Sequence, residues 1–227
     1  MISVGILDTK GLGHCPSLEF LLAKGERERL EKMNKGKARS LSFFSRLLLV
    51  KIYEEKTKKK LPEISYTETG KPYFRDDVCS FSVSHDRDIV VVALNDEGNI
   101  GVDVQSFDGS EAAMKRIEKR FLKDIAVDEE KITNLDIRFD FFTLDSSNDS
   151  IDLKKTGEKE MIFKNEKSEI KDFLLRWTKL ESLLKLVGCG FKETKNVNKY
   201  LQTTSFKTSF FQHGGQCFAL SLAFYKR

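Results

Sequence analysis

A helical pattern followed by a β-rich region occurs twice in the sequence, once in each half of the chain. The first helix is predicted over about Lys37–Glu55, and the strands that follow it lie between Ser80 and Gln105. The second is predicted over Lys171–Val187, and two further strands follow over Gln202–Phe211 and Gln216–Phe224. This order favours an α+β fold made of two similar halves, with a site between them.

Further elements are predicted in both halves. A β-branched strand covers Ile2–Leu7, and an amphipathic helix is expected over Pro16–Met33. The strands between Ser80 and Gln105 are separated by turn-forming residues and should form an antiparallel meander. Another helix is predicted over Ser110–Leu122. We place the boundary between an N-terminal half, residues 1–98, and a C-terminal half, residues 99–227.

A polar segment over about Asp128–Ser168 is interpreted as an insertion into the second half. It is rich in Asp, Ser, Asn, Lys and Glu and contains two strand-like islands, IRFDFFTL and EMIFK, which could form a hairpin.

Composition excludes several classes of protein. The 227 residues are 40% hydrophobic, which is sufficient for a real core, and the net charge is only +4. The 18 phenylalanines mostly fall at core spacing without an interleaved basic patch, so no nucleic-acid partner is expected. The four cysteines are scattered, and we find neither a signal-peptide pattern nor a membrane span. We therefore expect a cytoplasmic protein, monomeric, with reduced thiols and no membrane partner.

Four short motifs carry side chains suited to phosphate and metal chemistry. Lys71 projects from a stiffened Gly-Lys-Pro loop, although such a loop taken alone is an ordinary turn. Ser84-His85 ends a strand and offers a hydroxyl and an imidazole. These neighbours point to opposite faces of the strand, which argues against a Ser-His hydrolase.

The other two motifs supply carboxylates. Asp103 alternates with apolar residues in GVDVQ, and a carboxylate in a buried strand is costly unless it binds a cation or a donor. Glu181 and Lys185 lie one turn apart on the second long helix, a pattern that most often means a surface ion pair. In combination, the motifs suggest one site where Asp103 and Glu181 hold a divalent cation beside groups that bind phosphate.

The blocks GKPYF, FSVSH, GVDVQ and RWTKLESLLKLVGCGF resemble, in order, those of the Sfp-type 4′-phosphopantetheinyl transferases. The last block is the most specific, because Trp177, Thr178, Glu181, Ser182, Lys185 and the following Gly-x-Gly match the family pattern. The resemblance implies two α+β halves related by a pseudo-twofold axis. It also implies Mg²⁺-dependent transfer of 4′-phosphopantetheine from coenzyme A to a serine of an acyl or peptidyl carrier protein, with release of 3′,5′-ADP.

The same resemblance assigns roles to individual residues. Asp103 and Glu181 would bind Mg²⁺, or Mn²⁺ in its place, and Lys185 would stabilise charge on the transferred phosphate. Glu181 is also the candidate base for the carrier serine. The residues implied to bind coenzyme A are Lys71, Pro72, Ser84 and His85, with Lys24, Arg27, Arg39 and Ser40 reaching its adenosine-phosphate end. The polar segment over 128–168 is a candidate contact for the acceptor protein.

Two positions depart from the family pattern. Gln105 stands where many relatives have a third carboxylate, and its amide oxygen is a weaker candidate ligand. Leu180 stands where many have a lysine, and Lys179 is displaced by about 100° around the helix. These departures keep open a second reading, a coenzyme A or nucleotide-binding protein with little or no transferase turnover.

Overall fold

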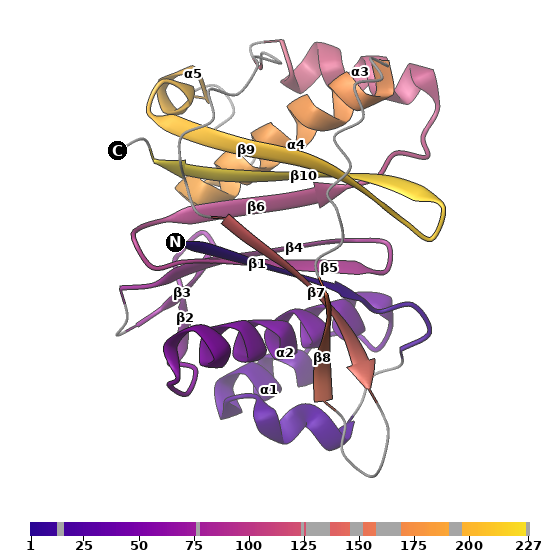
Figure 1. Cartoon of the computed structure of the whole chain (residues 1–227). Coiled ribbons are helices and arrows are strands. Elements are labelled where there is room, and N and C mark those ends of the chain that lie inside the picture. Colours follow the sequence, from indigo (N-terminus) through magenta and orange to yellow (C-terminus); the bar gives the residue numbers. More distant parts are fainter. Residues whose placement is uncertain are drawn as a thin grey trace.

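Two β-sheets pack face to face, and helices cover the outer face of each, in the computed structural model of the chain (Figure 1). The structure describes residues 1–12, 16–75, 78–123, 125, 137–145, 152–157, 169–190 and 197–225. The first sheet has the strand order β4-β5-β1-β7-β8 and the second β6-β10-β9, while β2 and β3 form a separate small hairpin. The strands are β1 Ile2–Asp8, β2 Ile64–Tyr66, β3 Pro72–Phe74, β4 Ser80–Asp86, β5 Ile89–Asn95, β6 Ile100–Gln105, β7 Ile137–Asp145, β8 Asp152–Gly157, β9 Thr204–His213 and β10 Gln216–Tyr225.

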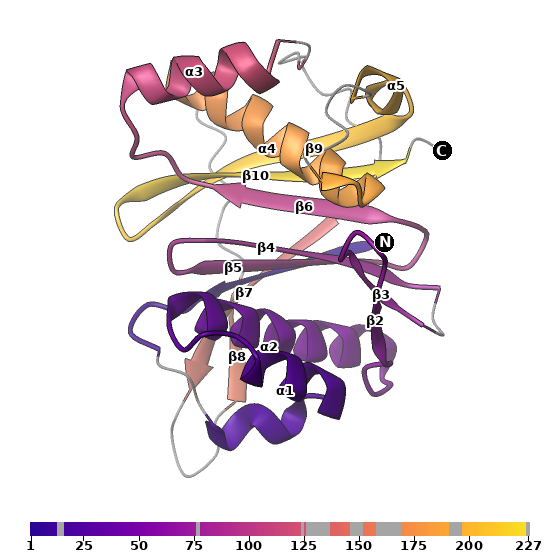
Figure 2. The same cartoon turned by 180° about the vertical axis from the view of Figure 1, so that it is seen from behind.

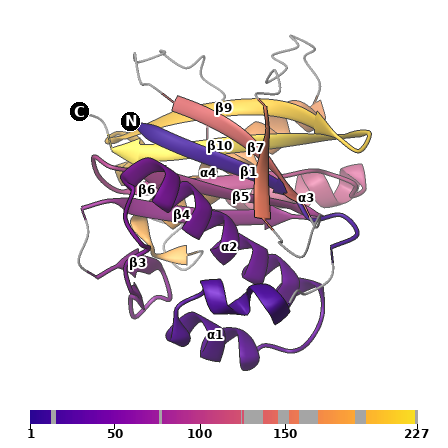
Figure 3. The same cartoon turned by 60° about the horizontal axis from the view of Figure 1, so that its bottom comes forward.

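The helices form the two outer layers. They are the short 3₁₀ helix η1 Pro16–Leu21, α1 Lys24–Glu31, α2 Lys37–Thr57, α3 Glu111–Phe121, α4 Glu169–Val187 and α5 Val197–Leu201. Figure 2 shows α3, α4 and α5 on the outer side of the second sheet. Figure 3 shows α2 crossing the first sheet, with α1 beside it and farther from the strands. Among the described residues, no helix is long and apolar enough to span a membrane.

Strand alternation divides the apolar residues into separate cores. Ile2, Val4 and Ile6 on β1 point between the two sheets, while Leu7 joins the core beneath α2. Gly5 lets β1 approach α2 closely, because a Cβ there would lie 2.2 Å from Cδ1 of Ile52 and would force that side chain to move. A third core lies between the second sheet and the helices α3 and α4. The resulting layer order is helix, sheet, sheet, helix.

Each sheet, together with the long helix that covers it, is built from a single strand, that helix and a hairpin in the same order along the chain. In the first, β1 is followed by α2 and the β4–β5 hairpin, and β1 pairs antiparallel with β5. In the second, β6 is followed by α4 and the β9–β10 hairpin, and β6 pairs antiparallel with β10. The α+β class and the repeated order of helix and strands predicted from the sequence are confirmed.

Three local predictions were wrong or incomplete. The meander ends after β5, because β6 pairs with β10 in the other sheet. The predicted helix over Pro16–Met33 is two helices, η1 and α1. Within the predicted insertion, β7 pairs parallel with β1 and antiparallel with β8, so a hairpin is present and extends the first sheet. The EMIFK island lies outside the described residues, and the proposed boundary at residue 98 stays a prediction.

Candidate active site

Serine side chains join the two sheets where their edge strands β4 and β6 run side by side. Ser82 and Ser84 alternate along β4 and accept hydrogen bonds from the backbone N–H groups of Val102 (3.0 Å) and Val104 (3.3 Å) on β6. Ser80 donates to the carbonyl of Gly98 at 2.5 Å. Hydroxyl groups therefore satisfy polar groups at an edge where no backbone ladder forms between the sheets. The alternating serines of SFSVS carry this pattern, and they mark the edge at which the predicted meander ends.

A pocket of about 560 Å³ opens along this line between the two halves. It combines residues from β4, β6, α2, α4 and the loop before β3. The residues predicted from sequence that line it are Lys71, Pro72, Ser84, His85, Asp103, Gln105, Glu181 and Lys185. Four separate sequence motifs therefore meet in one cavity, as the order of the motifs suggested.

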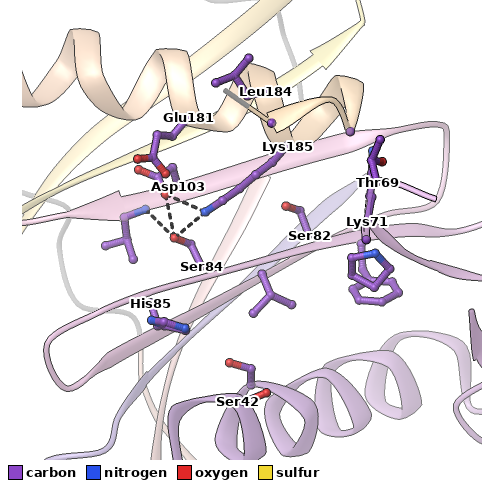
Figure 4. A pocket seen from close by; sticks show the side chains of 18 of the residues that line it. Ser42, Thr69, Lys71, Ser82, Ser84, His85, Asp103, Glu181, Leu184 and Lys185 are labelled. Carbon is purple, nitrogen blue, oxygen red and sulfur yellow. Dashed lines mark hydrogen bonds and ion pairs between the residues drawn. The ribbon is translucent and has the colours of Figure 1, made fainter. Parts of the chain in front are cut away.

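Asp103, Ser84 and Lys185 form a compact polar cluster in the pocket (Figure 4). The Ser84 hydroxyl donates to Asp103 Oδ1 at 2.8 Å, and the Lys185 ammonium donates to the same oxygen at 2.7 Å and to Ser84 Oγ at 2.9 Å. Asp103 is 3% exposed, and its second oxygen, Oδ2, is buried without a hydrogen-bond partner. An unpartnered buried carboxylate oxygen is costly, which makes it a candidate ligand for a cation.

The carboxyl group of Glu181 lies beside that of Asp103 (Figure 4). The pKa of Glu181 is raised to about 7, chiefly by burial and next by the charge of Asp103, while the charge of Lys185 opposes the rise. Burial likewise raises the pKa of Asp103, against the effects of Lys185 and Ser84. Two adjacent buried carboxylates cannot both ionise cheaply, so the pair favours either a shared proton or a bound cation.

This donor set fits a magnesium ion. Mg²⁺ prefers oxygen ligands and is often held by only one or two carboxylates, with water and phosphate oxygens completing its coordination. Asp103 and Glu181 supply the carboxylates, and Gln105 lines the same pocket while its Nε2 donates to the Ser106 carbonyl at 2.9 Å. No cluster of three or more His, Cys, Asp or Glu side chains occurs within the described ranges.

Helix α4 aims Glu181 and Lys185 because it packs very closely on β6. A Cβ on Gly101 would lie 1.9 Å from the Ser182 carbonyl oxygen, so only glycine permits this approach. Asp103 lies two residues farther along β6, on the same face as Gly101. One turn earlier on the same face of α4, the hydroxyls of Thr178 and Ser221 are 2.7 Å apart and connect the helix to β10.

His85 and Lys71 occupy other parts of the pocket wall. Partial burial lowers the pKa of the His85 imidazole, and the charge of Lys185 lowers it further. Burial also lowers the pKa of Lys71, whose ammonium donates to the Leu186 carbonyl at 2.6 Å. Both side chains can donate hydrogen bonds toward an anionic ligand, although neither is hydrogen-bonded to Asp103 or Glu181 within the described part of the chain.

The four residues assigned to the adenosine-phosphate end do not line the pocket, and all four belong to the described part of the chain. Lys24 is largely exposed, and its Nζ lies 3.8 Å from Oε1 of Glu28, while Nη2 of Arg39 lies 3.6 Å from Oε1 of Glu19. Arg27 and Ser40 are partly buried on α1 and α2. Their roles stay predictions that require a contact outside this cavity.

Sequence reasoning missed a polar wall that α2 contributes. Ser42, Ser45 and Arg46 line the pocket, and Arg46 Nε donates to Glu26 at 2.5 Å. The Tyr66 hydroxyl completes this buried network by donating to Glu26 Oε1 at 2.8 Å. A usable signal was present, because an arginine inside the apolar stripe of a helix requires a buried acidic partner.

The two departures from the family pattern have clear locations. Leu180 is completely buried in the core between α4 and the second sheet. Lys179 is also buried, and its ammonium lies 5.9 Å from the centre of the Phe206 ring on β9. Neither residue lines the pocket, so no lysine from these two positions reaches the carboxylates.

The fold and pocket define an α+β protein with a site suited to a divalent cation and an anionic ligand. A family model described as 4′-phosphopantetheinyl transferase, N-terminal, matches residues 17–97. This match supports the 4′-phosphopantetheinyl transferase family, and it covers the half of the pocket that contains α2, Lys71, Ser84 and His85. It does not extend to Asp103, Glu181 or Lys185. A comparison with curated proteins found no match.

Proposed function

We propose that the protein transfers 4′-phosphopantetheine from coenzyme A to a serine of an acyl or peptidyl carrier protein, as an Sfp-type enzyme. The observation that carries the proposal is the meeting of Asp103, Glu181 and Lys185 in one pocket with Ser84, which belongs to the segment that matches the family. The repeated strand, helix and hairpin order supports two halves related by a pseudo-twofold axis.

The chemistry requires the carrier serine oxygen to bond to the β-phosphate of coenzyme A while the bond to 3′,5′-ADP breaks. Asp103 and Glu181, with Gln105 as a third candidate, would hold Mg²⁺, which neutralises the diphosphate when bound. Lys185 would stabilise charge on the transferred phosphate, and the hydrogen bonds of its ammonium to Asp103 and Ser84 in the same pocket support this role. His85 and Lys71 would donate to other phosphate oxygens.

Glu181 is the best candidate to accept the proton of the carrier serine, directly or through a water molecule. In the metal-free site its pKa is raised to about 7, and a cation held beside it would favour the ionised form that accepts a proton at neutral pH. No covalent enzyme intermediate is needed. Ser84 is poorly placed as a nucleophile because its hydroxyl is buried and hydrogen-bonded to Asp103.

The test is to incubate the protein with coenzyme A, Mg²⁺ and a panel of apo carrier proteins, and to measure carrier masses. We expect the mass of one phosphopantetheine group on at least one carrier, and no addition when Mg²⁺ is removed with a chelator. Coenzyme A binding without any adduct across fatty acid, polyketide and nonribosomal peptide carriers would favour the alternative function. Gln105 and Leu180 are the observations that support that alternative, a binding protein without turnover.

A further inference from the structure

The turn between β2 and β3 fixes the backbone of Lys71. Thr67 N–H donates to the Lys71 carbonyl at 2.9 Å, and Lys71 N–H donates to Thr67 Oγ1 at 3.0 Å. Gly70 lies between them with a φ of 86°, a conformation that favours glycine. The side chain of Lys71 therefore leaves the N-terminal part of the fold from a well-defined point.

This side chain crosses to the C-terminal end of α4 in the other half. Its ammonium donates to the carbonyl of Leu186 at 2.6 Å, one residue before Val187 ends the helix. Carbonyl groups in the last turn of a helix have no partner within the helix. A cation at this position satisfies one of them and also complements the negative end of the helix dipole.

Gly188 provides the space that the Lys71 stem occupies. A Cβ at residue 188 would lie 2.8 Å from Cδ of Lys71, and the residue also has a φ of 79°. Gly190 has a φ of 59°, but a Cβ there would contact nothing within 4 Å. Both glycines relieve backbone strain, whereas only Gly188 also permits the lysine to approach.

We propose that Lys71 is a positioning residue that holds the last turn of α4, and with it Lys185, against the N-terminal half before any ligand binds. Leu186 directly follows Lys185, whose ammonium contacts Asp103 and Ser84. Gly101 on β6 packs closely on α4 at both the Ser182 carbonyl and the Leu186 N–H, whereas Lys71 reaches the Leu186 carbonyl from the N-terminal half and so restrains the same turn from a second side. This role goes beyond the proposed transfer reaction and does not depend on it.

Hydrogen exchange of the ligand-free protein tests the role directly. The N–H groups of Gly188 and Cys189 both donate to the Leu184 carbonyl, at 2.8 and 3.3 Å, and report on the last turn. In Lys71→Met these two amides should exchange about tenfold faster, since a hydrogen bond to a charged group is lost. Lys71→Arg should restore most of the protection. Lys115→Met, at an exposed lysine on α3, is the matched control and should leave these amides unchanged.

Unchanged exchange at Gly188 and Cys189 in Lys71→Met would overturn the proposal, whether or not transfer is ever observed. Gly188→Ala should also accelerate exchange at Cys189 more than Gly190→Ala does, because only the first displaces Lys71. Where transfer is measured, Lys71→Met should lower kcat at saturating coenzyme A. A change confined to the KM for coenzyme A would assign Lys71 to substrate binding alone and would also overturn the positioning role.

Discussion

Replacing Glu181 with Gln should stabilise the metal-free protein at pH 8. Burial, with the neighbouring Asp103 charge, raises the pKa of Glu181 from its ordinary value of 4.5 to about 7. The folded state thus holds this proton more tightly than the unfolded state does. It follows that folding stability is lost as pH rises from about 4.5 through about 7. Glutamine keeps the shape of the protonated side chain and cannot ionise.

The expected size follows from these two pKa values. Each unit of pKa difference between the folded and unfolded states corresponds to about 1.4 kcal/mol. Ionisation of Glu181 therefore lowers the free energy of unfolding by about 3 kcal/mol at pH 8 and by less than about 1 kcal/mol at pH 5. In a chain of this length, 1 kcal/mol shifts the Tm by about 2–4 °C. Glu181→Gln should therefore raise the Tm at pH 8 by about 6–12 °C, with a much smaller rise at pH 5.

Thermal unfolding followed by circular dichroism in the presence of a chelator measures this difference. Glu169→Gln is the matched control, because Glu169 is exposed at the start of the same helix and should change the Tm little at either pH. Mg²⁺ should raise the Tm of the wild-type protein at pH 8 and have little effect on Glu181→Gln. The reasoning about the carboxylate pair would be refuted if Glu181→Gln were less stable than the wild-type protein at pH 8. It would also be refuted if the substitution shifted the Tm equally at pH 8 and pH 5.

Three further outcomes are expected. Protons compete with the cation for Glu181, because the pKa of this carboxyl group is raised to about 7. Mn²⁺ affinity measured by calorimetry should therefore fall below pH 7 by up to about tenfold per pH unit. An affinity that does not change with pH would exclude Glu181 as a ligand. Ser84→Ala should lower the free energy of unfolding, measured by chemical denaturation, by about 1–3 kcal/mol, because Asp103 Oδ1 and the Val104 N–H each lose a hydrogen-bond partner. The same substitution should weaken coenzyme A binding. Loss of all transfer at saturating coenzyme A would instead indicate an essential catalytic hydroxyl. Leu180→Lys should destabilise the fold by more than about 3 kcal/mol, because residue 180 is completely buried in the core and does not face the pocket. A stable and more active variant would contradict this placement.

The long helices and most strands were predictable because their apolar spacing is strong and local. The pattern over Lys171–Val187 became α4, Glu169–Val187, and that over Lys37–Glu55 became α2, Lys37–Thr57. Which strands pair was not predictable, since the pairing of β6 with β10 joins segments more than a hundred residues apart in sequence. Strand alternation alone cannot choose between a meander and two packed sheets, because it sets which face is buried and not which neighbour is paired.

The site shows the same division between local and long-range information. The carboxylates and Lys185 were identifiable because a charge in an apolar strand or helix needs a reason. The serine contacts between β4 and β6 were not, because they depend on two sheet edges meeting. Arg46 was overlooked although it interrupts the apolar stripe of α2, and its partners Glu26 and Tyr66 each lie 20 residues away along the chain.

If Asp103, Glu181 and Lys185 form a transfer site, replacing Glu181 should change the mass spectrum of an apo carrier protein after incubation with coenzyme A and Mg²⁺. The wild-type protein and Glu169→Gln should each add one phosphopantetheine group per carrier serine and release an equal amount of 3′,5′-ADP. Glu181→Gln should remain folded and add none. Equal modification by Glu181→Gln and the wild-type protein would contradict the assignment of this site.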